Sequence, residues 1–220
     1  MSTENLIADL VRDFQPVIRA SRPGVLFAKW SAVSLLYVAI GTLFIGTRND
    51  LAEMWSELDS IVHTLLVLSV AVLAATIAFK ASIPDRAQRF LIMSLFVALT
   101  AWFAWIVIAV VTAGEPHAGH GWKCVRNIVV IALPLGALMY SMISRAAPLR
   151  TGTVGWLAAL SAAAAADFAT RFICRNDHAV HSLIWHFLPV LALSCAGVLL
   201  GRVAFRWEGA RRSAGAEVQR

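Results

Sequence analysis

Charged side chains are scarce in this chain of 220 residues, because Asp, Glu, Lys and Arg make up only 15% of it, against about 25% in soluble domains. Hydrophobic residues reach 59%, an excess that one water-soluble globule of this size cannot bury. The same hydrophobicity excludes a disordered chain, and the length excludes a small disulfide-bonded secreted domain. The net charge of +6 is spread between long apolar runs, so it does not indicate direct nucleic-acid binding. These features indicate an integral membrane protein.

Six apolar stretches approach the roughly 20 residues that cross a bilayer as a helix. They are Val25–Gly46, Ser60–Lys80, Phe90–Thr112, Val125–Ser144, Thr151–Phe172 and Ser182–Phe205. The period-two alternation of membrane β-strands is absent, and a span in hydrocarbon must pair its own backbone groups, which favours helices. The connections are short, so no soluble catalytic domain is inserted. We predict an all-α integral membrane protein with six transmembrane helices.

An even number of spans places both termini on the same side of the membrane. Fourteen of the 19 Lys and Arg residues fall on that side. The five on the other side are Arg48, Lys123, Arg126, Arg171 and Arg175. Because basic residues concentrate in cytoplasmic loops, we predict that both termini are cytoplasmic. Tryptophans near span ends are expected as interfacial anchors; they are Trp30, Trp122, Trp156, Trp185 and Trp207.

Histidine and cysteine gather on the predicted outer side. The two outer loops read His117-x-x-His120-x-x-x-Cys124 and Cys174-x-x-x-His178-x-x-His181. In an oxidising compartment a bridge between Cys124 and Cys174 would close a loop of about 50 residues, which contributes ~4 kcal/mol if the geometry is unstrained. Cys195 lies within the last span, where a small packing residue is expected.

Three interpretations of these residues stay open. The cysteines form a structural disulfide, or they are a pair whose state responds to oxidant or metal, or they belong to a permanent metal or haem site. Thiolate and imidazole suit zinc or copper, which makes His117, His120, His178 and His181 candidate ligands for a soft metal ion. Histidines in loops without a helix are, however, more often merely solvated.

Asp167 follows a run of alanines near the outer end of the fifth span. An ionised carboxylate there needs a partner. Arg171 can reach it at i, i+4, and His186 on the sixth span is the second candidate. We expect a local, buried polar cluster of these three residues. Small residues let helices approach closely, so the alanine run predicts that the fifth span is central in the bundle.

The amino-terminal segment has the pattern of a short amphipathic helix. Its apolar residues recur at helical spacing, and they are Leu6, Ile7, Leu10, Val11 and Phe14. Asp9 and Asp13 lie on the remaining surface, and Pro16 ends or kinks the run. Helices that bind membrane surfaces are usually rich in Lys and Arg, unlike this one. Docking into a groove on a protein partner is therefore favoured over membrane association or packing on the protein's own loops.

The chain resembles the NrsF-type (negative regulator of sigma F) anti-sigma factors, small six-helix inner-membrane proteins of bacteria. The similarity rests on four short stretches that span most of the chain. They are Leu6-Ile7-Ala8-Asp9-Leu10 with Pro16-Val17, Gly121-Trp122-Lys123-Cys124, Ala147-Pro148-Leu149, and Cys174 followed by Trp185-His186. The resemblance implies that the amino-terminal segment binds an extracytoplasmic-function sigma factor. It also implies that the outer-side cysteines, Cys124 and Cys174, sense metal or oxidative stress.

We therefore expect a non-enzymatic, multi-pass anti-sigma factor of the inner membrane that releases its sigma factor on periplasmic stress. The expected division is a sigma-binding segment at 1–24, a transmembrane domain at 25–206 and a cytoplasmic tail at 207–220. The alternative is a small membrane thiol or haem oxidoreductase that uses the same Cys and His residues. Against it, the chain has no CxxC pair, and only His63 and His186 lie near the depth that a bis-histidine haem needs.

Overall fold

The computed structural model describes residues 3–4, 11, 22–82, 88–113, 119–146, 148 and 150–218, with side chains described up to Phe205. Its elements are α2 (Pro23–Ile45), α3 (Leu51–Met54), α4 (Leu58–Ala81), α5 (Arg89–Ala113), α6 (Trp122–Ser144), α7 (Thr151–Arg171), α8 (Ala179–Ser182), the π-helix η1 (Leu183–Phe187) and α9 (Leu188–Val218). Within these ranges every regular element is a helix.

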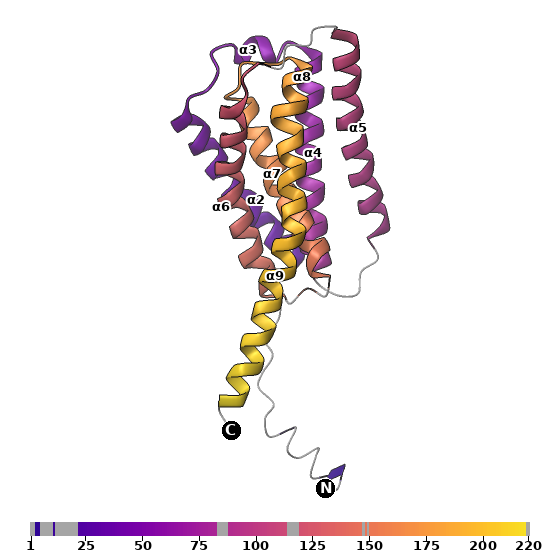
Figure 1. Ribbon diagram of the computed structural model, residues 1–220, viewed down its shortest axis with the longest axis vertical. Coiled ribbons are helices and arrows are strands. Elements are labelled where there is room, and N and C mark those ends of the chain that lie inside the picture. Colours follow the sequence, from indigo (N-terminus) through magenta and orange to yellow (C-terminus); the bar gives the residue numbers. More distant parts are fainter. Residues whose placement is uncertain are drawn as a thin grey trace.

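Six helical segments are long and apolar enough to cross a membrane, which confirms the predicted fold class. Each begins and ends within three residues of the predicted span. The helices form a bundle in which α9 continues past the end of the other helices (Figure 1). The short helix α3 and the start of α8 lie at the opposite end, which is called the α3 end below.

Helix α7 is the centre of the bundle, as the alanine run predicted. In the most apolar 18-residue stretch of α7, 67% of the residues are buried, whereas the corresponding values are 11% for α2 and 22% for α5. Helices α4, α6 and α9 all pack against it, and its alanines from Ala162 to Ala164 are at most 2% exposed. Small side chains let the three neighbouring helices approach the α7 backbone closely.

The closest helix approach joins α7 to α9 near the end of the bundle away from α3. A Cβ atom added at Gly155 would lie 2.4 Å from the carbonyl oxygen of Gly197 and 2.7 Å from the Cα atom of Gly201. The Tyr140 hydroxyl of α6 donates to the carbonyl oxygens of Gly155 and Gly197, at 3.0 Å from each. Helices α6, α7 and α9 are therefore joined at this end.

We expect Gly155→Ala to destabilise the folded protein by roughly 1–3 kcal/mol, because the new methyl group meets backbone atoms that cannot rotate away. Gly41→Ala in α2 is the matched control, since no atom lies within 4 Å of its added Cβ and alanine is the better helix former. Thermal unfolding of the purified protein in detergent measures both changes. Equal midpoints for the two variants would contradict this account of the α7–α9 contact.

Helix α2 is attached to α6 at a proline. Pro134 has no N–H, so the carbonyl of Val130 lacks its helical donor, and the Tyr37 hydroxyl donates to that carbonyl at 3.5 Å. The indole of Trp30 donates to the carbonyl of Leu135 at 3.1 Å and is 4% exposed. The expectation that Trp30 is an interfacial anchor is therefore wrong: its ring is buried, and it fixes α2 against α6.

Candidate functional site: a thiol and imidazole cluster

Two sulfur atoms and an imidazole meet at the α3 end of the bundle. Cys124 lies in the first turn of α6, where its N–H donates to the carbonyl of Gly121. Cys174 follows α7, and its N–H donates to the carbonyl of Thr170. Their Sγ atoms are 3.3 Å apart, and the Nε2 atom of His181 lies 3.6 Å from the first and 3.5 Å from the second. The sulfurs are thus separate thiols within contact distance of each other and of one ring.

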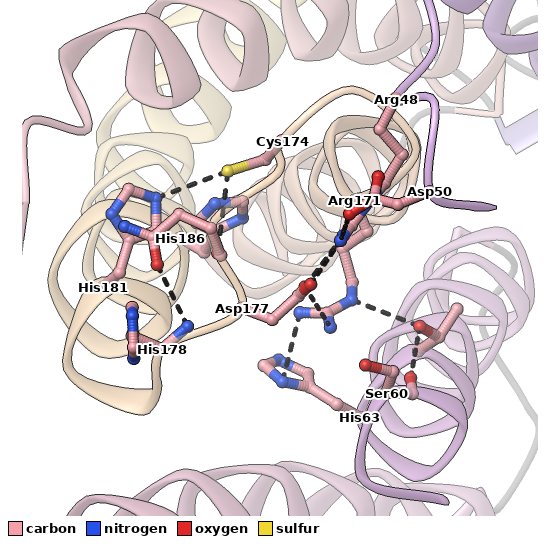
Figure 2. Close-up of polar contacts among 12 residues, drawn as sticks. Arg48, Asp50, Ser60, His63, Arg171, Cys174, Asp177, His178, His181 and His186 are labelled. Carbon is pink, nitrogen blue, oxygen red and sulfur yellow. Dashed lines mark hydrogen bonds and ion pairs between the residues drawn. The ribbon is translucent and has the colours of Figure 1, made fainter. Parts of the chain in front are cut away.

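The Cys174 sulfur is directed at the rings of both His181 and His186 (Figure 2). Hydrogen bonding from the Cys124 thiol, supported by His181 and His186, lowers the pKa of Cys174 below its ordinary value, and burial opposes this shift. A lowered pKa favours the thiolate, which is the form that attacks oxidants and binds metals. Cys124, Cys174 and His181 line a cavity of about 1010 Å³ at the α3 end, through which solutes can reach the sulfurs.

His186 links the cluster to the buried carboxylate of Asp167. Its Nδ1 atom lies 2.6 Å from Oδ1 of Asp167, whose side chain is fully buried. The carboxylate therefore pairs with the second of the two predicted candidates. The Arg171 guanidinium has other partners (Thr64 and Asp177). The Oδ2 atom of Asp167 has no hydrogen-bond partner among the residues that the structure describes.

Arg171 instead joins α7 to α4 and to the Cys174 loop. Its Nε donates to the Thr64 hydroxyl at 3.2 Å, Nη1 lies 3.2 Å from Nδ1 of His63, and Nη2 lies 3.7 Å from Asp177. The Trp102 indole donates to Nε2 of His63 at 2.9 Å. Both ring nitrogens of His63 are therefore occupied by protein groups, so His63 is not placed to ligate a haem iron.

The loop that carries Cys174 is fixed by Arg48 to the connection between α2 and α3. The Arg48 guanidinium bonds Asp50 at 2.7 Å and Asp177 at 2.9 Å, and the backbone N–H of Arg48 donates to the carbonyl of Phe172. The guanidinium of Arg48 lowers the pKa of Asp50 to about 2, and hydrogen bonds to Asp50 and Asp177 raise the pKa of Arg48. Figure 2 shows Asp177 between the two arginines, Arg48 and Arg171.

Two of the stretches that carry the family resemblance meet beside the cluster. A Cβ atom at Gly121 would lie 2.0 Å from Cγ of Trp185, so only glycine allows this ring to pack there. The Trp185 indole also donates to the carbonyl of Gly119 at 3.1 Å. This contact sets the start of α6, with Cys124, against the turn that carries His186.

The model of the family described as negative regulator of sigma F (NrsF) matches residues 10–207. The chain belongs to this family. Neither a curated protein nor a solved structure matches it. The family description names a regulator of a sigma factor, which suggests a non-enzymatic, regulatory role, and the six apolar helices make this member a multi-pass membrane protein.

The structure brings together only part of the residue set that the sequence suggested for this NrsF-family chain. Among the described residues, the ligand atoms of Cys124, Cys174, His181 and His186 all lie within 4.8 Å of one another and could hold a metal ion. His120 and His178, both exposed, are not in that group. The further candidate ligand His117 lies outside the described residues.

Two other sets of predicted residues have different outcomes. Cys195 is exposed on the outside of the bundle, so it does not pack between helices as expected. Of the predicted sigma-binding residues the structure describes Val11, whose side chain is 66% exposed. The others lie outside the described residues, and they are Leu6, Ile7, Asp9, Leu10, Asp13 and Phe14.

Sequence reasoning placed His186 with Asp167, but it did not place His186 with the cysteines. The signal that could have found it is the spacing of five residues from His181. Residues five apart share one face of a helix only where the helix contains a π turn. The sequence gives no sign that a π turn forms here, so the spacing alone could not place His186 beside the cysteines.

Proposed function

We propose that this protein is an inner-membrane anti-sigma factor that holds an extracytoplasmic-function sigma factor at the cytoplasmic face and releases it when Cys124 and Cys174 react on the periplasmic face. The observation that carries the regulatory role is the family match over residues 10–207. The 3.3 Å separation of the two sulfurs supports the sensing role. The lipid bilayer is the second partner, and the protein does not bind nucleic acid itself.

The sigma factor binds residues 1–24. The apolar side chains of Leu6, Leu10 and Phe14 fill a groove on its surface, while Asp9 and Asp13 face its basic residues. The exposed side chain of Val11 agrees with a segment that is available to a partner. Residues 25–206 form the transmembrane domain, and residues 207–220 form the tail, of which residues 207–218 continue α9.

Two reactions at the sulfur pair fit its geometry. A peroxide accepts two electrons from the thiols of Cys124 and Cys174, so that the S–S bond forms and both thiol protons leave with the reduced oxygen as water. Alternatively, a soft metal ion displaces the thiol protons and binds both sulfurs. Either reaction changes the separation of the sulfurs from 3.3 Å: a disulfide shortens it to about 2.05 Å, and a tetrahedral ion with metal–sulfur bonds of about 2.3 Å widens it to about 3.8 Å.

Helices α6, α7 and α9 carry the change across the membrane. At the α3 end, Cys124 lies in α6 and Cys174 follows α7. His181 and His186 lie in the turns that lead into α9. At the other end Tyr140 joins the same three helices through Gly155 and Gly197. Because α7 is packed between stiff neighbours, movement of one helix end is transmitted to the other end rather than absorbed locally.

The experiment that tests the anti-sigma role is co-purification from bacterial membranes. A tagged full-length protein is expected to retain an extracytoplasmic-function sigma factor, above all one encoded beside its own gene. Removal of residues 1–16 is expected to abolish this capture while the membrane protein itself stays abundant. Equal capture by the truncated and full-length proteins would contradict the placement of the sigma-binding segment.

The membrane orientation gives a separate prediction. Reporter fusions after Arg86 and Arg150 are expected to read as cytoplasmic, and fusions at Asp50, Gly119 and Asn176 as periplasmic, because 14 of the 19 basic residues lie on the side of the termini. A pair of reporters, one active only in the cytoplasm and one only in the periplasm, measures each site. A cytoplasmic signal at Gly119 would place the cysteines on the wrong side for periplasmic sensing.

A further inference from the structure

The four side chains of the cluster lie close to the spacing of a closed tetrahedral zinc site, with shifts of a few tenths of an ångström to about 1 Å needed to reach it. With Zn–S bonds of about 2.3 Å and Zn–N bonds of about 2.0 Å, two tetrahedral ligand atoms lie about 3.5–3.8 Å apart when at least one is sulfur. The sulfurs of Cys124 and Cys174 are 3.3 Å apart, and Nε2 of His181 lies 3.5 and 3.6 Å from them. His186 completes a set of four within 4.8 Å.

A π-helical turn places the two histidines on the same side. His181 is in α8, and His186 lies five residues later in η1. In an α-helix, residues five apart point about 140° away from each other, whereas the i→i+5 hydrogen bond of a π turn returns the chain to the same face. The two ring centroids are 5.4 Å apart. Single π turns of this kind concentrate at functional sites.

Asp167 is the hydrogen-bond acceptor that a metal-bound histidine needs for its second ring nitrogen. Its Oδ1 lies 2.6 Å from Nδ1 of His186, which orients the ring and leaves Nε2 as the ligand atom. A carboxylate in this position fixes the tautomer and raises the basicity of the ligand. The Asp167 side chain is fully buried, and its other oxygen, Oδ2, has no hydrogen-bond partner among the described residues, so His186 is its one hydrogen-bond partner there.

Two thiolates that bind a divalent ion balance its charge, so the ion and the two sulfurs form a neutral unit. A buried site holds such a unit at lower cost than an unpaired charge.

We propose that Cys124, Cys174, His181 and His186 bind one Zn²⁺ ion in a tetrahedral site, with Asp167 orienting His186. The proposal deepens the sensing role proposed above, because it names the ion and two further ligands. Zn²⁺ is the ion that a tetrahedral site of two sulfurs and two nitrogens favours. The cavity beside the sulfurs provides the route of entry.

The test is a Co²⁺ titration of the purified full-length protein in detergent, reduced and freed of metal beforehand. Cobalt replaces zinc in tetrahedral sites and reports its ligands by absorption. We expect one Co²⁺ per chain, a thiolate-to-cobalt charge-transfer band, the intense visible bands of tetrahedral Co²⁺, and their loss when one equivalent of Zn²⁺ is added. Absence of a thiolate band would overturn the proposal.

Two variants, each with a matched control, test the ligand His186 and the carboxylate that orients it. His186→Ala is expected to abolish the tetrahedral spectrum, and the exposed His178→Ala is the matched control that retains it. Asp167→Asn is expected to keep the spectrum but weaken cobalt binding by about 10–100-fold, whereas Asp59→Asn, which removes an exposed carboxylate, leaves the affinity unchanged. An unchanged affinity in Asp167→Asn would remove that residue from the site.

His181→Cys keeps the proposal falsifiable if the alanine variants fail to fold. A third thiolate is expected to make the charge-transfer band roughly half as strong again while the tetrahedral bands persist. An unchanged band would show that residue 181 is not a ligand. Cobalt binding requires no sigma factor, so a normal titration with failed sigma capture would overturn only the proposed function, and the reverse result would overturn only the zinc site.

Discussion

Leu10→Glu and Phe14→Glu are each expected to abolish capture of the sigma factor, lowering its affinity by roughly a thousandfold or more. A glutamate forced into a groove that fits an apolar side chain must lose its hydration without a partner, which costs several kcal/mol, and each 1.4 kcal/mol is a factor of ten in affinity. Neither residue belongs to the six membrane-spanning helices. The substitutions should therefore leave the bundle intact.

Quantitative pull-down from detergent-solubilised membranes measures this effect, with membrane abundance recorded in parallel. Leu10→Met is the matched control, because it conserves volume and apolar character, and it is expected to capture the sigma factor as the unmodified protein does. Undiminished capture by both glutamate variants would show that the amphipathic segment is not the sigma-binding element.

The membrane-spanning helices could be predicted from sequence because the bilayer itself imposes their length and helical state. The central place of α7 followed from the run of alanines before Asp167, since only small side chains permit close helix approach. Trp30 shows where this reasoning fails. Position near a span end indicated an interfacial anchor, but the ring is buried against α6, where its indole N–H donates to the carbonyl of Leu135.

The site was predictable only in part, because its assembly depends on contacts between helices distant in the sequence. The mirrored loops pointed to Cys124 and Cys174, whose sulfurs the structure brings together. The sequence could not show that Arg171 is held by Thr64 and Asp177, which leaves Asp167 to His186. Nor could it show the π turn, since no local residue preference distinguishes that turn from the α-helix around it.

Cys124→Ser and Cys174→Ser are each expected to eliminate the release of the sigma factor on exposure to thiol-reactive metal or peroxide, while sigma capture survives. A hydroxyl group forms no disulfide and is a poor ligand for a soft ion. The double variant is expected to match either single one, because the two sulfurs act as a unit. Cys195→Ser, at an exposed position outside the cluster, is the control that should respond normally.

Measuring membrane abundance together with a sigma-dependent reporter separates a sensor from a structural bridge. A sensor predicts normal abundance and a silent reporter in the cysteine variants, whereas a bridge that only stabilises the fold predicts low abundance and constant sigma release. Moving the sigma factor from 99% bound to 99% free takes about 5.5 kcal/mol of differential stabilisation between the two folded states. Metal coordination uses both sulfurs and both histidines, whereas the disulfide uses the sulfurs alone, so His186→Ala should weaken the response to metal more than the response to peroxide.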